Sequence, residues 1–253
     1  MRIRFVVLVC FILGTSVTCK PDKKNHKSKK EVTEKDFEVF TTGISEFSGL
    51  CQGKTADTFL AISDKRGIFE INKEGNILRK LPLSENIDFE AITINPVNND
   101  IYLADEGNMR IFKLSEDERS LLPVTEIHII GGVVNKGLEG VAYGNGVLYI
   151  VNQESPSILI KYELNSGKET DRIAINYVQQ LSDIFYDNND NSLWICDSKL
   201  KKVFHTDLNG IVIDYQSIDY VKKAEAILVD RQAGIIWIGC DQTGFLYKIN
   251  LKI

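Results

Sequence analysis

Histidine and cysteine are scarce in this 253-residue sequence, and neither has the spacing of a metal site or a catalytic triad. Its three histidines lie far apart, so a zinc site of the His/Cys type is excluded: they are His26, His128 and His205. No nucleophile elbow, phosphate-binding loop or dinucleotide fingerprint is present. After Cys19, three cysteines remain without metal-type spacing, and we expect them to pack in the core: Cys51, Cys196 and Cys240.

Positive charge is lacking in most of the chain. The whole sequence has a net charge of -5, but residues 1–30 carry eight basic and one acidic residue. The remainder carries 22 basic and 34 acidic residues, a net charge of -12. Nucleic acid needs a basic face, so we expect no nucleic-acid partner. An acidic surface is compatible with bound cations, or simply with solubility.

Long hydrophobic runs are also lacking. The longest one, Phe5–Leu13, is too short to span a bilayer as a stable helix. It follows Arg2 and Arg4 and precedes small and polar residues, which is the pattern of an export signal. Ser16–Cys19 resembles the lipobox of bacterial lipoproteins, without its usual leucine. We therefore predict a signal peptide over 1–19, a lipidated Cys19 and attachment to the bacterial cell envelope; secretion without lipid is the alternative.

Residues 20–36 follow as a lysine-rich segment without apolar periodicity. Such a segment cannot bury enough apolar surface to fold, so we predict a disordered tether. Its lysines can contact anionic lipid head groups, or they can serve only as a solvated spacer. A single folded domain is expected over 37–253.

That domain repeats one unit five times. Each unit has a short apolar strand, a tight turn, and two further apolar strands. The first strands begin at Ser48, Glu90, Glu139, Ser182 and Glu225. The second strands are Phe59–Asp64, Ile101–Glu106, Leu148–Gln153, Leu193–Ser198 and Ile236–Asp241. A repeat of roughly 40–50 residues with about four short strands predicts an all-β, five-bladed β-propeller.

The fifth unit has only three strands, which end near Ile249, whereas Phe37–Thr41 forms a strand before the first unit. We expect this N-terminal strand to complete the last blade, which closes the ring and removes exposed edges. Aromatic residues recur at one position of the second strands, and we expect them to fill the space between blades: Tyr102, Tyr149, Trp194 and Trp237. We expect a monomer.

Acidic residues recur where first strands begin and second strands end. Antiparallel pairing brings these two places to the same end of the ring. The first-strand positions are Glu90, Glu139, Asp183 and Glu225. The second-strand positions, which would form a ligand mouth, are Asp64, Asp105, Glu106, Glu154, Asp197 and Asp241. Asp183 stands where other units have glycine or alanine, so we expect its side chain to point into the channel.

Such a gathering of carboxylates is unstable unless it is neutralised. Two charges ~5 Å apart at an effective dielectric of about 20 repel by roughly 3 kcal/mol. Either some carboxylates are protonated, or a cation lies among them. Oxygen ligands from several loops suit Ca²⁺. The alternative is that Glu90, Glu139 and Glu225 accept hydrogen bonds from backbone N–H groups of the next blade and hold the ring together.

The blocks FSGL, DFEAI, GLEGVAY, LSDIFYD and AEAILVD resemble those of the SdiA-regulated family of exported bacterial propellers, from about Phe37 to Ile249. This resemblance implies five blades, a Ca²⁺ ion at a shared acidic site, and a suggested phosphodiesterase-like activity. The positions that match the acidic first-strand positions of the family are Glu90, Glu139, Asp183 and Glu225. The sequence departs at Ala226, where the family usually has glycine, and at Asp241, where it usually has glutamate.

Three functions remain open. The first is a membrane-anchored, Ca²⁺-binding propeller that binds an unidentified small molecule or protein and is not an enzyme. The second is a Ca²⁺-dependent phosphodiesterase or related phosphoesterase, for which basic residues near the mouth would hold the anion: Lys65, Arg66, Arg110 and Lys199. The third is a structural scaffold without a ligand.

Overall fold

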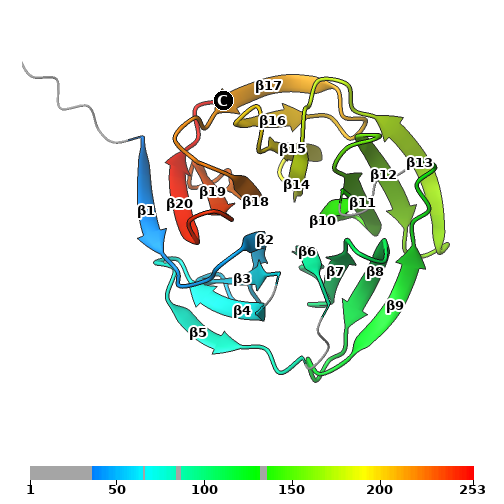
Figure 1. The fold of residues 1–253 in the computed structure, drawn as a ribbon, viewed down its shortest axis with the longest axis horizontal. Coiled ribbons are helices and arrows are strands. Elements are labelled where there is room, and N and C mark those ends of the chain that lie inside the picture. The colour runs from blue at the N-terminus through cyan, green and yellow to red at the C-terminus, as the bar shows by residue number, and fades with distance from the viewer. Residues whose placement is uncertain (1–35, 65, 84–86, 132–135) are drawn as a thin grey trace, which may run out of the picture. The chain divides into compact units, whose positions relative to one another are not determined.

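A computed structural model describes residues 36–64, 66–83, 87–131 and 136–253. This part of the chain forms five antiparallel sheets of four strands each. The sheets stand around a central axis as the blades of a propeller, with β2, β6, β10, β14 and β18 innermost (Figure 1). The predicted five-bladed, all-β fold is confirmed. No helix of the described residues is long and apolar enough to cross a membrane.

Each blade runs outward from the axis in sequence order. Blade one comprises β2 (Phe47–Gln52), β3 (Thr58–Ser63), β4 (Gly67–Asn72) and β5 (Ile77–Lys80). Blade two comprises β6 (Phe89–Ile94), β7 (Ile101–Asp105), β8 (Arg110–Leu114) and β9 (Leu121–Glu126). Blade three comprises β10 (Leu138–Gly144), β11 (Val147–Asn152), β12 (Ile158–Glu163) and β13 (Lys168–Ala174). Blade four comprises β14 (Leu181–Asp187), β15 (Ser192–Asp197), β16 (Lys202–Thr206) and β17 (Val212–Ser217).

Blade five is built from both ends of the folded domain. It contains β18 (Ala224–Asp230), β19 (Ile235–Cys240) and β20 (Phe245–Asn250), with β1 (Phe37–Thr41) as its outer strand. Strand β1 pairs antiparallel with β20, from Phe37 opposite Ile249 to Thr41 opposite Phe245. The ring is therefore closed by main-chain hydrogen bonds rather than by side-chain packing alone, as the sequence predicted.

Burial falls from the axis to the rim. In blade three, most residues of β10 are buried, whereas β13 is almost entirely exposed. The recurring aromatics lie between blades: Tyr102 stacks on Tyr143 of the next blade with 6.3 Å between ring centroids, and Tyr149 stacks on Tyr186 at 5.5 Å. Such pairs add to the apolar area that holds neighbouring sheets together. As expected, Cys51, Cys196 and Cys240 are buried.

Small residues lie where blades crowd at the axis. A Cβ atom on Gly140 would lie 2.6 Å from Val151 Cγ2 and 2.9 Å from the backbone nitrogen of Ile184. Turns between first and second strands use residues that tolerate positive φ, such as Asn145 at 51° and Gly146 at 83°. These two features allow the innermost strands to approach the axis and reverse within two residues.

Candidate functional site

A β-bulge interrupts the innermost strand of every blade at the same place. In blade three the pairing of β10 with β11 skips from Leu138 to Gly140, so that Glu139 is the extra residue. The extra residues of the other blades are Ser48, Glu90, Ser182 and Glu225. A bulge releases its extra residue from the ladder and changes the direction of its side chain. The five bulges thus bring three glutamates to one end of the channel.

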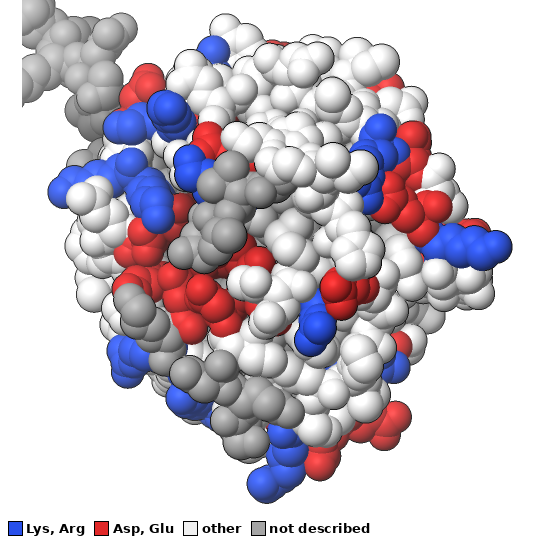
Figure 2. Space-filling view, turned by 45° about the vertical axis from the view of Figure 1, so that its right-hand side comes forward, with Lys and Arg blue, Asp and Glu red and all other residues white. Residues whose placement is uncertain are grey.

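These glutamates line a cavity of about 410 Å³ at that end, which we call the acidic mouth. Carboxylates gather in a hollow on this face of the molecule (Figure 2). The carboxylates of the lining are Asp64, Glu90, Glu106, Glu139, Glu154 and Glu225. Three lysines line it as well: Lys136, Lys199 and Lys223. The acidic mouth therefore holds more negative than positive groups, but it is not purely acidic.

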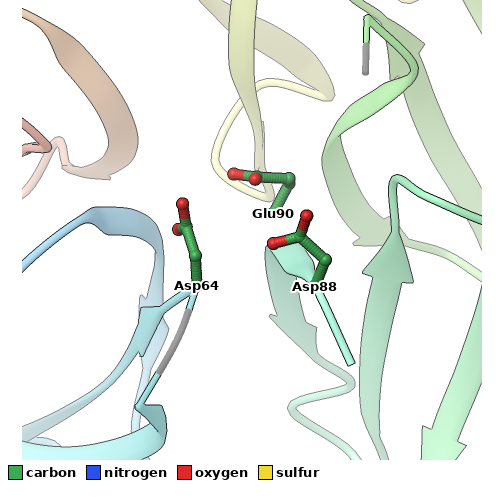
Figure 3. Close-up of side chains that lie close together, drawn as sticks. All are labelled: Asp64, Asp88 and Glu90. Atoms are coloured by element: carbon green, nitrogen blue, oxygen red, sulfur yellow. The ribbon is translucent and has the colours of Figure 1, made fainter. Parts of the chain in front are cut away.

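The tightest group in the acidic mouth is formed by Asp64, Asp88 and Glu90. One carboxylate oxygen from each lies within 4.8 Å of the other two. Asp64 follows β3 of blade one, whereas Asp88 and Glu90 flank the start of β6 in blade two, and the three side chains converge (Figure 3). Asp88 was missed by the sequence analysis, although it lies only two residues before the bulged Glu90.

The pKa values of these carboxyls reflect burial and mutual repulsion. Burial first, and then the charges of Asp64 and Glu225, raise the pKa of Glu90 to about 9. Burial and the neighbouring Glu90 raise the pKa of Glu139 well above its ordinary value. Burial raises the pKa of Asp64 too, and its Oδ1 atom has no hydrogen-bond partner among the described residues. Burial and neighbouring carboxylates therefore favour the protonated forms of these three carboxyls.

The blade-five side of the mouth is neutralised by a lysine. Lys223 Nζ lies 2.6 Å from Glu225 Oε1 and 2.8 Å from Asp241 Oδ2. Burial raises the pKa of Glu225 and Lys223 lowers it, which leaves it at about 7. Burial lowers the pKa of Lys223, but its two acidic partners outweigh this effect and raise it overall. Asp241 therefore belongs to an ion pair beside the mouth.

Asp183 does not line the acidic mouth. It is only 2% exposed, and its carboxylate accepts hydrogen bonds of 2.8 Å from the backbone N–H groups of Ile184 and Ile227. Ile227 belongs to β18 of the next blade, so Asp183 joins blades four and five. Ser48 makes a similar link from blade one, because its hydroxyl donates to the carbonyl of Phe89 at 3.1 Å.

Two other predicted mouth residues cap turns. Asp105 accepts hydrogen bonds from the backbone and side-chain nitrogens of Asn108. Asp197 accepts four backbone hydrogen bonds, and its donors are Gln179, Gln180, Lys199 and Leu200. Neither aspartate lines the acidic mouth. Both aspartates end a second strand, and their side chains accept N–H groups of the turn that follows.

Glu106 and Glu154 do line the mouth, on its blade-three side. Glu106 accepts a hydrogen bond of 3.2 Å from the backbone of Gly137, and Glu154 pairs with Lys136. Of the basic residues predicted there, Lys199 lines the cavity and is exposed. Two others are engaged elsewhere: Arg66 donates to the carbonyl of Gly43, and Arg110 pairs with Glu126. Lys65 and Cys19 lie outside the described residues.

The sequence profile of the SdiA-regulated family matches residues 26–249. The chain belongs to the SdiA-regulated family. Among solved structures, the glutaminyl cyclase of Myxococcus xanthus is similar, with 14% identity, a TM-score of 0.66 and coverage of 84% of this chain and 94% of that one. Virginiamycin B lyase from Staphylococcus aureus has 18% identity, a TM-score of 0.52 and coverage of 82% and 67%. At these identities the likeness shows the propeller fold alone.

The acidic mouth of this SdiA-regulated propeller offers the donor set of a hard cation. Its carboxylate oxygens come from neighbouring blades, and one of them, Asp64 Oδ1, is buried and has no hydrogen-bond partner within residues 36–64, 66–83, 87–131 and 136–253. Ca²⁺ accepts six to eight oxygen ligands in flexible geometry, whereas zinc favours nitrogen and sulfur. The residues present therefore fit Ca²⁺ by their chemistry, and Asp64, Asp88 and Glu90 are the residues that would hold it.

Proposed function

We propose that this protein is a Ca²⁺-binding β-propeller that acts as a ligand- or protein-binding module of the bacterial envelope. The observation that carries the proposal is the convergence of Asp64, Asp88 and Glu90, whose oxygen atoms lie within 4.8 Å of one another. Like charges so close together repel unless a cation or protons compensate them. A divalent cation would remove this repulsion and would bind Asp64 Oδ1, a buried atom with no hydrogen-bond partner in the described part of the chain.

The rest of the acidic mouth suits recognition of a ligand above the ion. A Ca²⁺ ion held by Asp64, Asp88 and Glu90 would have further coordination positions, which oxygen atoms of a ligand could occupy. The opposite side offers the amides of Gln153 and Gln180 and the ammonium group of Lys199. These groups favour a ligand with a carboxylate, phosphate or hydroxyl group that reaches the ion.

A second candidate function is a Ca²⁺-dependent phosphoesterase. Lys199 and Lys223 line the same cavity as the metal-binding carboxylates, which favours an anion there. A bound metal ion supplies Lewis-acid polarisation of a phosphoryl oxygen. The lysines would hold and orient the phosphate, and a neighbouring carboxylate such as Glu139 would take up a proton from the attacking water. We favour the binding module because no fuller catalytic set can be named among the described residues of the mouth.

Attachment to the membrane is proposed from the sequence of residues 1–19. The basic start, the apolar run and the lipobox-like Ser16–Cys19 support a lipid on Cys19. The lysine-rich residues 20–36 would then separate the lipid from the propeller.

One set of assays separates these functions. Ca²⁺ at 100 times its dissociation constant should stabilise the protein by about 2.7 kcal/mol, seen as a rise in melting temperature, and Glu90→Gln should reduce that stabilisation by about half or more. Turnover of bis(p-nitrophenyl) phosphate that requires Ca²⁺ and is lost in Glu139→Gln would favour the phosphoesterase. No rise in melting temperature with Ca²⁺ would leave only the scaffold.

A further inference from the structure

A second cavity occupies the other end of the central channel. Its volume is about 440 Å³, and it is lined by the later residues of the five innermost strands and by the turns that follow them. In blade two, for example, Glu90 at the start of β6 lines the acidic mouth, whereas Ile92 to Ile94 line the second cavity. The two cavities therefore lie at opposite ends of the same ring of strands.

The wall of this second cavity is apolar. Each blade contributes an aliphatic side chain that is 4% exposed or less: Leu50, Ile92, Val141, Ile184 and Leu228. Burying an apolar ligand against such a wall is favourable, because it removes apolar surface from water without stranding polar groups. None of the wall residues just named carries a charge, in contrast to the acidic mouth.

Aromatic residues make this wall suited to a flat ring. Phe185 occupies the position held by Cys51, Thr93, Ala142 and Leu228 in the other blades, and it is the largest of the five. It is half-buried and reaches the apolar clusters on both sides of blade five. Tyr143 and Tyr186 also line the cavity, and each is already held by stacking on an aromatic ring of another strand. Tyr143 and Tyr186 are therefore held in place before any ligand arrives.

The rim of the cavity is polar, and its charged residues are Lys73, Asp230 and Arg231. Asp230 accepts the backbone N–H of Ala233, and Lys73 Nζ lies 3.9 Å from Asp57. Arg231 Nε donates to Asp187 at 2.8 Å, and Arg231 Nη2 pairs with Asp190 at 3.1 Å. The exposed amides of Asn188 and Gln232 line the rim and make no side-chain hydrogen bond within the part of the chain that the structure describes. These two amides are neutral and offer both donors and acceptors to a ligand at the rim.

We propose that this second cavity binds a neutral small organic molecule with an apolar, ring-sized body and a hydrogen-bonding head group. The body would lie against Phe185 and the aliphatic ring, and the head would meet the amides of Asn188 and Gln232. The volume falls within the ~300–1,000 Å³ typical of small-molecule pockets, as does the apolar lining with few polar groups. The site is separate from the acidic mouth and needs no Ca²⁺.

The test is a fluorescence titration of the protein with N-phenyl-1-naphthylamine, a neutral two-ring probe that brightens in apolar surroundings. One saturable site per chain is expected. Phe185→Ala should weaken binding at least tenfold, and Ile94→Trp, which places a larger side chain in the lining, should do the same. Ile213→Ser on the outer strand β17 is the control, because Ile213 is 61% exposed and far from the channel in the blade order.

Two further measurements make each outcome decisive. Near-ultraviolet circular dichroism of every variant identifies loss of folding, and the comparison uses whichever of the two cavity variants keeps the parent spectrum. EDTA and Glu90→Gln should leave probe binding unchanged, so failure of the Ca²⁺ proposal would not affect this one. Absence of saturable binding, or parent-like binding in a correctly folded cavity variant, would overturn the inference.

Discussion

The carboxylate of Asp183 accepts a hydrogen bond from the backbone N–H of Ile227, 2.8 Å away on the innermost strand of the next blade. The same carboxylate accepts the N–H of Ile184 on its own strand. Burial raises the pKa of Asp183 well above its ordinary value, whereas these two N–H groups lower it. Asp183 therefore links two blades at the axis, which is the role first considered for the glutamates.

Removal of this link should destabilise the ring. Asp183→Ala leaves two buried N–H groups without an acceptor, which we expect to lower the free energy of unfolding by about 2–5 kcal/mol. Asp183→Asn keeps an acceptor oxygen and should lose less. Urea denaturation measures both, with Asp214→Ala on the exposed strand β17 as the control. Equal stability of Asp183→Ala and the control would contradict the assigned link.

Crowding at the axis predicts a difference between two equivalent glycines. Gly140→Ala would place a Cβ atom 2.9 Å from the backbone nitrogen of Ile184, whereas the nearest atom to a Cβ on Gly49 is the flexible Cδ1 of Ile62 at 3.2 Å. We expect Gly140→Ala to cost about 1–3 kcal/mol of stability and Gly49→Ala clearly less. Melting temperatures of the two variants test this order, and the reverse order would refute it.

Stability should also depend on the protonation of His205. Burial and then Arg231 lower its pKa, against the opposing effect of Asp190 and Asp187. The unfolded chain then binds a proton below about pH 6.5 that the folded protein does not. Because of His205, the free energy of unfolding therefore decreases as pH falls from 6.5 towards the pKa that His205 has in the folded protein.

This effect is isolated by comparison with a variant. His205→Gln removes the titrating imidazole. The melting temperature of the parent protein should therefore fall further between pH 7 and pH 5 than that of the variant. Other groups titrate in both proteins and cancel in the difference. A difference that does not change with pH, or that changes in the opposite direction, would show that His205 is protonated in the folded state.

Lipidation is tested at Cys19. In a bacterial host that modifies lipoproteins, the parent chain should take up an alkyne-labelled fatty acid and sediment with membranes. Cys19→Ser should lose the label and leave the membrane fraction, whereas Cys51→Ser, at a buried position, should keep the label. Label on Cys19→Ser, or none on the parent chain, would disprove the anchor.

Most of the fold could be predicted because its signals are local. Each blade carries its own alternating strands and turn residues, such as Asn145-Gly146, and the unit is repeated five times. Closure of the ring by β1 could be predicted because the last repeat unit has only three strands of its own. The packing of aromatic side chains between blades could be predicted because they recur at one position of the second strands. Tyr102 and Trp237 are buried as predicted.

The candidate site could be predicted only in part, because side-chain direction depends on tertiary contacts. The repeated position of Glu90, Glu139 and Glu225 indicated one mouth, and these residues do line it together. Asp105 and Asp197 end their second strands one residue before the positions of Asp64 and Glu106, and their oxygens accept backbone N–H groups of loops. Aspartate before a turn is a known capping signal, and it would have separated these two residues from the mouth.

Calorimetric titration with Ca²⁺ at pH 7.5, in two buffers of different ionisation enthalpy, tests the central claim most directly. The account predicts one ion per chain and release of protons on binding, because the pKa of Glu90 is about 9 without the ion. Glu90→Gln should weaken binding at least tenfold, whereas Asp57→Asn, at a highly exposed position between β2 and β3, should bind as the parent does. No heat of binding, or equal affinity in Glu90→Gln, would contradict a cation site at the acidic mouth.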